Sequence, residues 1–176
     1  MHPKEIGNSY DAIAHIWREP RIQSNGLLQL ERALRFASQR RSGRSGSFAL
    51  DIGCGCSGRF IDVLARHGFQ VEGVDVSERM IELARQSHPH VLFHHADICE
   101  WKLPRKYDFV LAWDSIWHIP LDRQEPVLRE ICEGLEPGGV FMFTTGGLEK
   151  AEEKSIHAWA RPCITAHWVF RRHLNC

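Results

Sequence analysis

A chain of 176 residues, with 43% hydrophobic and 25% charged side chains, is long enough for one domain with a sizeable core. Its 22 basic side chains balance its 22 acidic ones, which argues against a nucleic acid or an anionic membrane as partner. The first residues lack an apolar signal core, and no apolar run has the length of a membrane span. We therefore predict a cytoplasmic protein whose six cysteines are reduced thiols.

The N-terminal part predicts two helices followed by a loop. Residues 9–18 and 27–37 carry apolar side chains at helical spacing. The stretch rich in Arg, Ser and Gly from 39 to 47 predicts a solvated loop. We assign residues 1–46 to N-terminal helices and a linker within a single domain that spans residues 1–176.

Residues 47–145 predict the core of that domain. Strands are expected at 48–52, 71–75, 91–95, 107–112 and 140–145, with helices at 58–67, 78–87 and 123–135. The strands are continuous apolar runs, which is typical of a parallel sheet buried on both faces. Their alternation with helices predicts an α/β fold with a doubly wound, mainly parallel, Rossmann-like sheet.

The turn after the first strand is the most informative feature of the chain. The strand ends at Asp51, and the chain passes Gly53, Gly55 and Gly58 before a helical pattern begins. Glycines let a ligand approach the backbone, where a side chain would occupy the ligand's space, and the start of a helix attracts anions. The second strand ends at Asp75, an acid placed to bind a ribose diol. This spacing alone leaves NAD and S-adenosylmethionine (SAM) open.

Five segments, in order, resemble the motifs of class I SAM-dependent methyltransferases of the small-molecule type. They are Leu50 to Gly55, Val74 to Met80, Ala96 to Ile98, Tyr107 to Ser115 and Leu135 to Thr145. The chain departs from the family's commonest loop, D-x-G-x-G-x-G, because Ser57 stands at the third glycine position and Gly58 follows it. The resemblance implies SAM as the cofactor.

The resemblance also implies roles for the residues around the cofactor. Asp51 and the N–H groups of Gly53, Cys54 and Gly55 are expected to face the methionine end of SAM, and Asp75 its ribose hydroxyls. The remaining cofactor contacts are expected from Val76 and Met80 at the adenine, Asp97 and Ile98 at its amino group, Trp113 and Asp114 near the sulfonium, and Tyr10 and Trp17 as a lid.

Structural alternatives stay open for several of these residues. Asp51 could only cap its turn, and Met80, Tyr10 and Trp17 lie at spacings that are also typical of core side chains. His118 is the candidate catalytic residue, as a general base for a hydroxyl or phenol, and it could equally be a packed histidine.

A metal site is not expected. The histidines at 88, 90, 94 and 95 accompany Cys99, but His94 and His95 follow each other on a strand and point to opposite faces. Cys54 and Cys56 also lack the spacing of a zinc site.

The segment 146–176 predicts a short, atypical C-terminus. Only 31 residues follow Thr145, enough for a helix at about 149–160 and one strand at about 163–170. A full sheet of the family it resembles has two further strands, so the C-terminal part is expected to be incomplete. An edge of the sheet would then stay exposed and favour self-association.

The function expected from these features is methyl transfer from SAM to a small-molecule acceptor, without nucleic acid or membrane as partner. Two alternatives remain. The same glycines suit an NAD-dependent oxidoreductase. The short C-terminus suits a truncated SAM-binding protein without activity.

Overall fold

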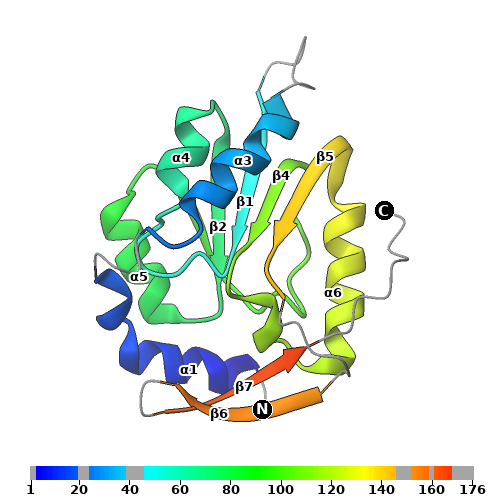
Figure 1. The fold of residues 1–176 in the computed structure, drawn as a ribbon. Helices are drawn as coiled ribbons and strands as arrows, with labels where there is room; N and C mark the ends of the chain where they lie inside the picture. Colours follow the sequence, from blue (N-terminus) through cyan, green and yellow to red (C-terminus); the bar gives the residue numbers. More distant parts are fainter. Residues whose placement is uncertain (1–2, 20–23, 39–45, 146–151, 159–160, 168–176) are drawn as a thin grey trace.

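A parallel five-stranded sheet forms the centre of the computed structural model (Figure 1), which describes residues 3–19, 24–38 and 46–145, together with the backbone of 152–158 and 161–167. Its strands are β1 (Phe48–Ile52), β2 (Gln70–Asp75), β3 (Leu92–His95), β4 (Tyr107–Ala112) and β5 (Leu135–Phe143). All five were expected from the apolar runs, although β5 begins five residues before the predicted position. The predicted doubly wound α/β fold is confirmed.

The strand order β3-β2-β1-β4-β5 creates a switch point beside β1. After β1 the chain adds β2 and β3 on one side, and it then crosses to add β4 and β5 on the other. Asp51 near the end of β1 is paired with Gly73 of β2 and with Leu111 of β4. In open α/β sheets, ligands bind at the carboxyl ends of the strands at such a point.

Helices cover both faces of the sheet (Figure 1). They are α3 (Leu27–Ser38), α4 (Ile61–Arg66), α5 (Glu78–Ser87) and α6 (Leu121–Glu133), with α1 (Pro3–Ile13) across the end of the sheet. The helix expected at 9–18 is instead the end of α1 followed by a 3-10 turn, η1 (Ile16–Arg18). The helix expected from residue 58 begins only at Ile61, because Gly58 has a φ of +57°, outside the helical region.

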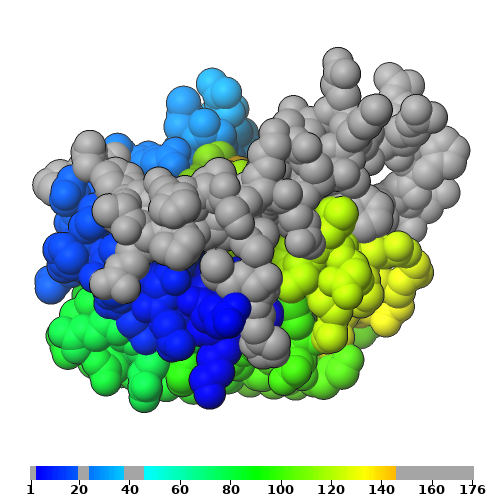
Figure 2. Space-filling model, turned by 90° about the horizontal axis from the view of Figure 1, so that it is seen from below, coloured from blue at the N-terminus to red at the C-terminus, as the bar shows by residue number. Residues whose placement is uncertain are grey.

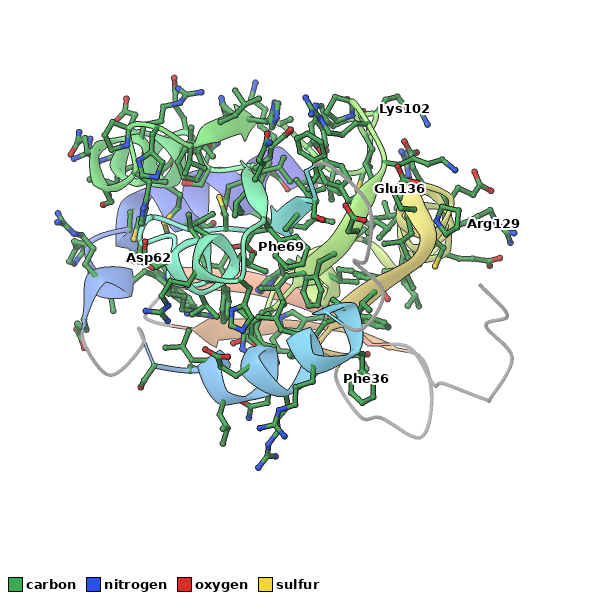
Figure 3. All side chains as sticks on the ribbon, turned by 90° about the horizontal axis from the view of Figure 1, so that it is seen from above. Phe36, Asp62, Phe69, Lys102, Arg129 and Glu136 are labelled. Atoms are coloured by element: carbon green, nitrogen blue, oxygen red, sulfur yellow. The ribbon has the colours of Figure 1, made fainter. Side chains whose placement is uncertain are left out.

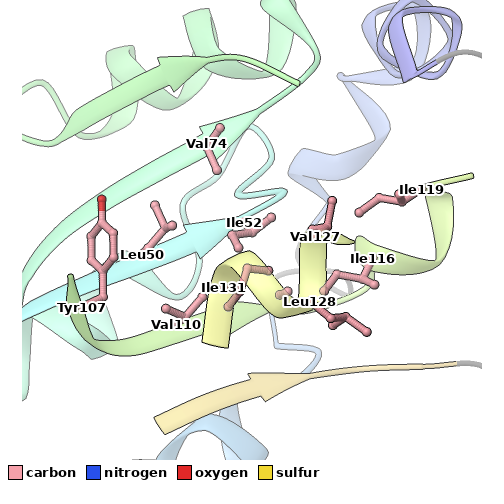
Figure 4. Packing of buried hydrophobic residues seen from close by; sticks show 11 residues of the cluster. Leu50, Ile52, Val74, Tyr107, Val110, Ile116, Ile119, Val127, Leu128 and Ile131 are labelled. Atoms are coloured by element: carbon pink, nitrogen blue, oxygen red, sulfur yellow. The ribbon is translucent and has the colours of Figure 1, made fainter. Parts of the chain in front are cut away.

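Two apolar clusters fix the helices to the sheet. Between the sheet and α6 lie buried side chains from β1, β2, β4 and the helix, which Figure 4 shows converging around Val110 and Ile131. On the other face, Leu30 and Leu34 of α3 and Leu64 of α4 pack against β1 and β4. Burying a leucine side chain contributes about 1.5–3 kcal/mol, so these contacts hold the strand ends in place.

Helix α3 buries only one of its faces. Leu30 and Leu34 are buried, whereas Leu28 is 60% exposed and Phe36 is 68% exposed. Phe36 projects away from the helix in Figure 3.

The C-terminal segment forms a hairpin of its own. Strands β6 (Glu152–Ala158) and β7 (Arg161–His167) pair antiparallel, and β7 lies beside α1 and η2 (Ile116–His118). The helix expected at 149–160 is therefore wrong where it overlaps β6, because pairing with β7 satisfies the backbone groups of this segment. The strand expected at 163–170 lies partly in β7, and its last three residues fall outside the described part of the chain.

None of the helices in the described residues is long and apolar enough to cross a membrane. The thiols of Cys54, Cys56 and Cys99 are free, whereas Cys132 is disulfide-bonded. The expectation that all cysteines are reduced is thus wrong for Cys132.

Among the described residues, β5 is an edge strand of the sheet. Among the described strands, only β4 pairs with β5, which is nine residues long and includes the half-buried, stacked pair Phe141 and Phe143. The opposite edge strand, β3, has four residues, and short edges resist pairing between chains.

We therefore expect weak self-association through β5, seen as a sedimentation coefficient that rises with protein concentration. Val140→Lys places a charge on this edge strand and beside the apolar cluster under α3, so circular dichroism first has to show an intact fold. The folded variant should then lose the rise, whereas Leu92→Lys on β3 should preserve it. A concentration-independent monomer, or equal effects of the two variants, would contradict an interface at β5.

Candidate cofactor site

A pocket opens at the carboxyl ends of β1, β2 and β4, at the switch point of the sheet. Its lining comes from residues 52–57, 59–60, 74–76, 96–98 and 113–119 with one gap, and from α1 and η1. Figure 2, the view onto this end, shows α1 in blue lying between the green residues that follow β2 and the yellow-green start of α6. The topology thus brings segments from the whole described core to one place.

The structure brings together all but one of the residues predicted for the site. Those that line the pocket are Tyr10, Trp17, Gly53, Cys54, Gly55, Asp75, Val76, Met80, Asp97, Ile98, Trp113, Asp114 and His118. Asp51 lies outside the lining and is 1% exposed.

The glycine turn is tied to β2 by its own backbone. The N–H groups of Gly53 and Cys54 donate to the Val74 carbonyl, at 2.8 and 3.2 Å, and the Gly55 N–H donates to Asp75 Oδ2 at 2.9 Å. These bonds hold the shape of the turn, because the parallel register brings the end of β2 beside it. That the turn faces the methionine end of a cofactor stays a prediction.

Gly53 and Gly55 of this turn are subject to different steric constraints. Gly53 has a φ of +71°, and a Cβ there would overlap the side chain of Ser115. Gly55 has a φ of +64°, and no atom lies within 4 Å of the place that a Cβ would occupy, so its open side faces the pocket that it lines. Only Gly55 leaves space for a ligand, whereas a side chain at Gly53 would disturb packing.

Asp75 organises the second side of the pocket. Besides Gly55, the N–H of Ser77 donates to its carboxylate, at 2.9 Å to Oδ1. Burial raises the pKa of Asp75, and the hydrogen bonds from Ser77 and Gly55 oppose that rise. A carboxylate oxygen can accept more than one hydrogen bond, so Asp75 retains the capacity to accept from ribose hydroxyls.

Asp51 is a buried carboxyl behind the glycine turn. Its Oδ2 has no hydrogen-bond partner among the described residues. Burial raises its pKa to about 7, the positive charge of Arg59 opposes the rise, and the negative charge of Asp75 adds to it. Such an acid is poised to ionise when a further cation comes near.

Met80 belongs both to the core and to the pocket. It is 2% exposed, packs with Ala14, Cys56 and Leu83, and also lines the cavity near Val76. The two alternatives that the sequence left open for this residue are therefore compatible.

Residues 96–98 form another wall of the pocket, and there the carboxyl of Asp97 is held by its own turn. Oδ1 of Asp97 accepts the backbone N–H of Cys99 at 2.9 Å, and the Asp97 carbonyl accepts that of Trp101 at 2.8 Å. These bonds orient the 96–98 segment, including Ile98, along the pocket.

The pocket's roof is aromatic. The Tyr10 hydroxyl lies 2.8 Å from His118 Nε2, and the Trp117 indole N–H donates to the same nitrogen at 3.2 Å. Because an indole N–H only donates, Nε2 is the acceptor of that bond, and its one lone pair faces both the indole N–H and the Tyr10 hydroxyl. Trp17 packs beside Tyr10, with ring centroids 5.9 Å apart. His118 thus has a packed, hydrogen-bonded position that also borders the pocket.

Asp114 is held in a strained backbone conformation, with a φ of +54°. Its N–H donates to Thr144 Oγ1 at 2.7 Å, and its carboxylate accepts from Asn25 Nδ2 at 3.0 Å. Burial raises its pKa, and Arg59 opposes that rise. Strain of this kind is often concentrated at functional sites.

Sequence reasoning missed several lining residues, above all Arg59. The others include Pro3, Ile6, Cys56, Phe60, Ser115, Ile116 and Ile119. The one signal for Arg59 was its position directly after Gly58, in the loop that leads into α4.

The histidine-rich segment has structural partners. His88 Nε2 lies 3.1 Å from the Ser57 carbonyl, and His94 Nε2 lies 3.0 Å from Glu72 Oε2, which also accepts from Tyr107. The partly exposed Arg105 adds a 3.0 Å ion pair with the buried Glu72. Within the described residues, no group of three or more His, Cys, Asp and Glu side chains is arranged to hold a metal ion.

The sequence profile of the family described as "Methyltransferase domain" matches residues 49–139, the segment that carries the glycine turn, Asp75 and the wall after β4. The chain belongs to the class I methyltransferase family. The resemblance seen in the five motifs is therefore confirmed.

Named relatives agree with this membership. The chain is 32% identical to a 27-O-demethylrifamycin SV methyltransferase of Amycolatopsis mediterranei over 78% of this chain and 56% of that protein. It is 27% identical to a ubiquinone biosynthesis O-methyltransferase of Idiomarina loihiensis over 96% of this chain and 68% of that protein. The chain thus spans between about half and 70% of the length of these relatives.

A solved structure shares the fold. It is the SAM-bound amino pentose methyltransferase CalS10 of Micromonospora echinaspora, with a TM-score of 0.56 at 24% identity. The match covers 72% of this chain and 57% of that structure.

The buried Asp51 predicts a pH-dependent stability. Its folded pKa of about 7 lies above the ordinary 3.8, so the folded state binds an extra proton between these values. The free energy of unfolding should therefore fall as pH rises from about 4 to about 7. Asp51→Asn, measured by urea unfolding, should remove on the order of 3 kcal/mol of this fall. Parallel pH profiles for the two proteins would contradict it.

The two glycines of the turn should differ in their tolerance of alanine. The positive φ alone costs about 1–2 kcal/mol at either position. Gly53→Ala should lower the free energy of unfolding further, because its Cβ overlaps Ser115, while Gly55→Ala meets open space. Thermal unfolding of the two variants measures the difference. Equal losses of stability in the two variants would contradict the difference in space at Gly53 and Gly55.

Proposed function

We propose that the chain binds SAM and transfers its methyl group to a small-molecule acceptor. The observation that carries the proposal is the pocket at the switch point, where Gly55 offers open space, Asp75 borders it and the buried Asp51 Oδ2 has no partner among the described residues. These features fit SAM, which has a ribose diol for Asp75 and positive charges that would stabilise the ionised form of Asp51.

In this proposal, the residues of the site contact different parts of the cofactor. Asp75 accepts from the ribose hydroxyls, Val76 and Met80 pack on the adenine, and Asp97 accepts from its amino group beside Ile98. SAM, when bound, supplies a methyl group already activated on its sulfonium. The protein therefore has to align the acceptor and exclude water, and side-chain chemistry is secondary.

The aromatic roof suits this task. Tyr10, Trp17 and Trp113 place apolar surface around the transfer end of the pocket, which excludes water. His118 holds the roof through the Tyr10 hydroxyl, 2.8 Å from its Nε2, and the lone pair of Nε2 is already engaged by the Trp117 indole N–H. We therefore assign His118 to positioning the roof, in preference to a general base.

The acceptor class follows from the relatives. Those reported above are named as methyltransferases of 27-O-demethylrifamycin SV, of ubiquinone biosynthesis and of an amino pentose, all small molecules. With basic and acidic side chains balanced, we propose a cytoplasmic enzyme without a nucleic acid or membrane partner.

Titration calorimetry tests this function. SAM and S-adenosylhomocysteine, its demethylated product, should bind, and NAD should bind much more weakly. Asp75→Ala should weaken binding of SAM at least tenfold, since a charged hydrogen bond contributes about 1.5–3 kcal/mol. Glu100→Ala, an exposed acid outside the pocket lining, serves as the matched control. Tighter binding of NAD than of SAM would favour the oxidoreductase instead.

A further inference from the structure

Charges around the pocket are unevenly distributed. Among the described lining residues, Arg59 is the one Lys or Arg side chain, whereas Asp75, Asp97 and Asp114 contribute three carboxyls. An anionic group inside this pocket therefore has a single strongly cationic side chain to bind.

Several backbone N–H groups of the glycine turn already have partners within the protein. The N–H groups of Gly53, Cys54 and Gly55 already donate to Val74 and Asp75. Helix α4, which follows the turn, is only six residues long and begins at Ile61, whose N–H donates to the Gly58 carbonyl. None of these four N–H groups is left for an anion, and Arg59 is its one cationic side-chain partner among the described lining residues.

Arg59 lines the pocket and is coupled electrostatically to two acids. Its guanidinium interacts electrostatically with Asp51 behind the turn and with Asp114 on the wall after β4, and its carbon lies 4.7 Å from the centre of the Phe60 ring. An arginine stays cationic even when burial lowers its pKa, and its planar fork matches a carboxylate. The pocket lining thus combines one cationic side chain with the carboxyls of Asp75, Asp97 and Asp114, and a zwitterionic amino acid carries the complementary pair of charges.

We propose that Arg59 binds the α-carboxylate of the cofactor's methionine end, while Asp51 and Asp114 attract its α-ammonium. The inference rests on the proposed function and adds a binding residue to it. Arg59 thereby distinguishes ligands with an amino-acid end from those that have only the adenosine part.

Three ligands separate the groups involved. S-Adenosylhomocysteine carries both the carboxylate and the amine, decarboxylated SAM keeps the amine alone, and 5′-methylthioadenosine lacks both. Calorimetry with wild type, Arg59→Met and Arg59→Lys measures each affinity. Arg66→Met, at an exposed arginine of α4, is the matched control.

Arg59→Met should weaken binding of S-adenosylhomocysteine at least tenfold and change the affinities of the other two ligands less than about threefold. Arg59→Lys should recover part of the loss, and Arg66→Met should behave as wild type. An unchanged affinity for S-adenosylhomocysteine, or an equal loss for all three ligands, would overturn the role of Arg59. Failure of the wild type to bind any of the three would instead refute the proposed function.

Discussion

The attachment of the glycine turn to the end of β2 is the constraint on which the site depends. Two N–H groups of the turn converge on the Val74 carbonyl, and a third reaches the Asp75 carboxylate. Because these bonds link the segment after β1 to its neighbour in the sheet, the turn has its shape before any ligand arrives. A pre-formed site of this kind avoids the ordering cost that a flexible loop would add to binding.

The same attachment concentrates negative charge. Pinning the turn brings Asp75 close enough to Asp51 for its negative charge to raise the pKa of Asp51, and Asp114 adds a third carboxyl at the pocket. Desolvation makes this arrangement costly when the pocket is empty. A ligand that carries positive charge offsets the cost, which matches the net charge of SAM better than that of NAD.

The sequence predicted what depends on local pattern. The continuous apolar runs predicted all five strands of the sheet. The residues of the sequence motifs predicted most of the pocket lining. What the local pattern did not report depends on contacts between distant segments. The N–H groups of the turn are occupied because of the register between β1 and β2, and no local pattern reports that register. Residues 152–158 carry charged and apolar residues at a spacing compatible with a helix, and pairing with β7 decided otherwise. Arg59 stood next to a recognised motif, but its two acidic neighbours come from β1 and from the turn after β4.

Ser77 links Asp75, at the side of the pocket, to helix α1, which carries Tyr10 of the aromatic roof. Its N–H donates to Asp75, its hydroxyl accepts from the Met80 N–H at the start of α5, and the same hydroxyl donates to Asp11 of α1 at 2.5 Å. Asp11 also accepts from the Arg79 N–H, so α1 is anchored on the turn that Asp75 organises. We therefore expect α1 to open locally together with the wall of the pocket that Asp75 forms. Ligand occupancy should therefore slow amide hydrogen exchange in α1, a segment distant in sequence from the glycine turn.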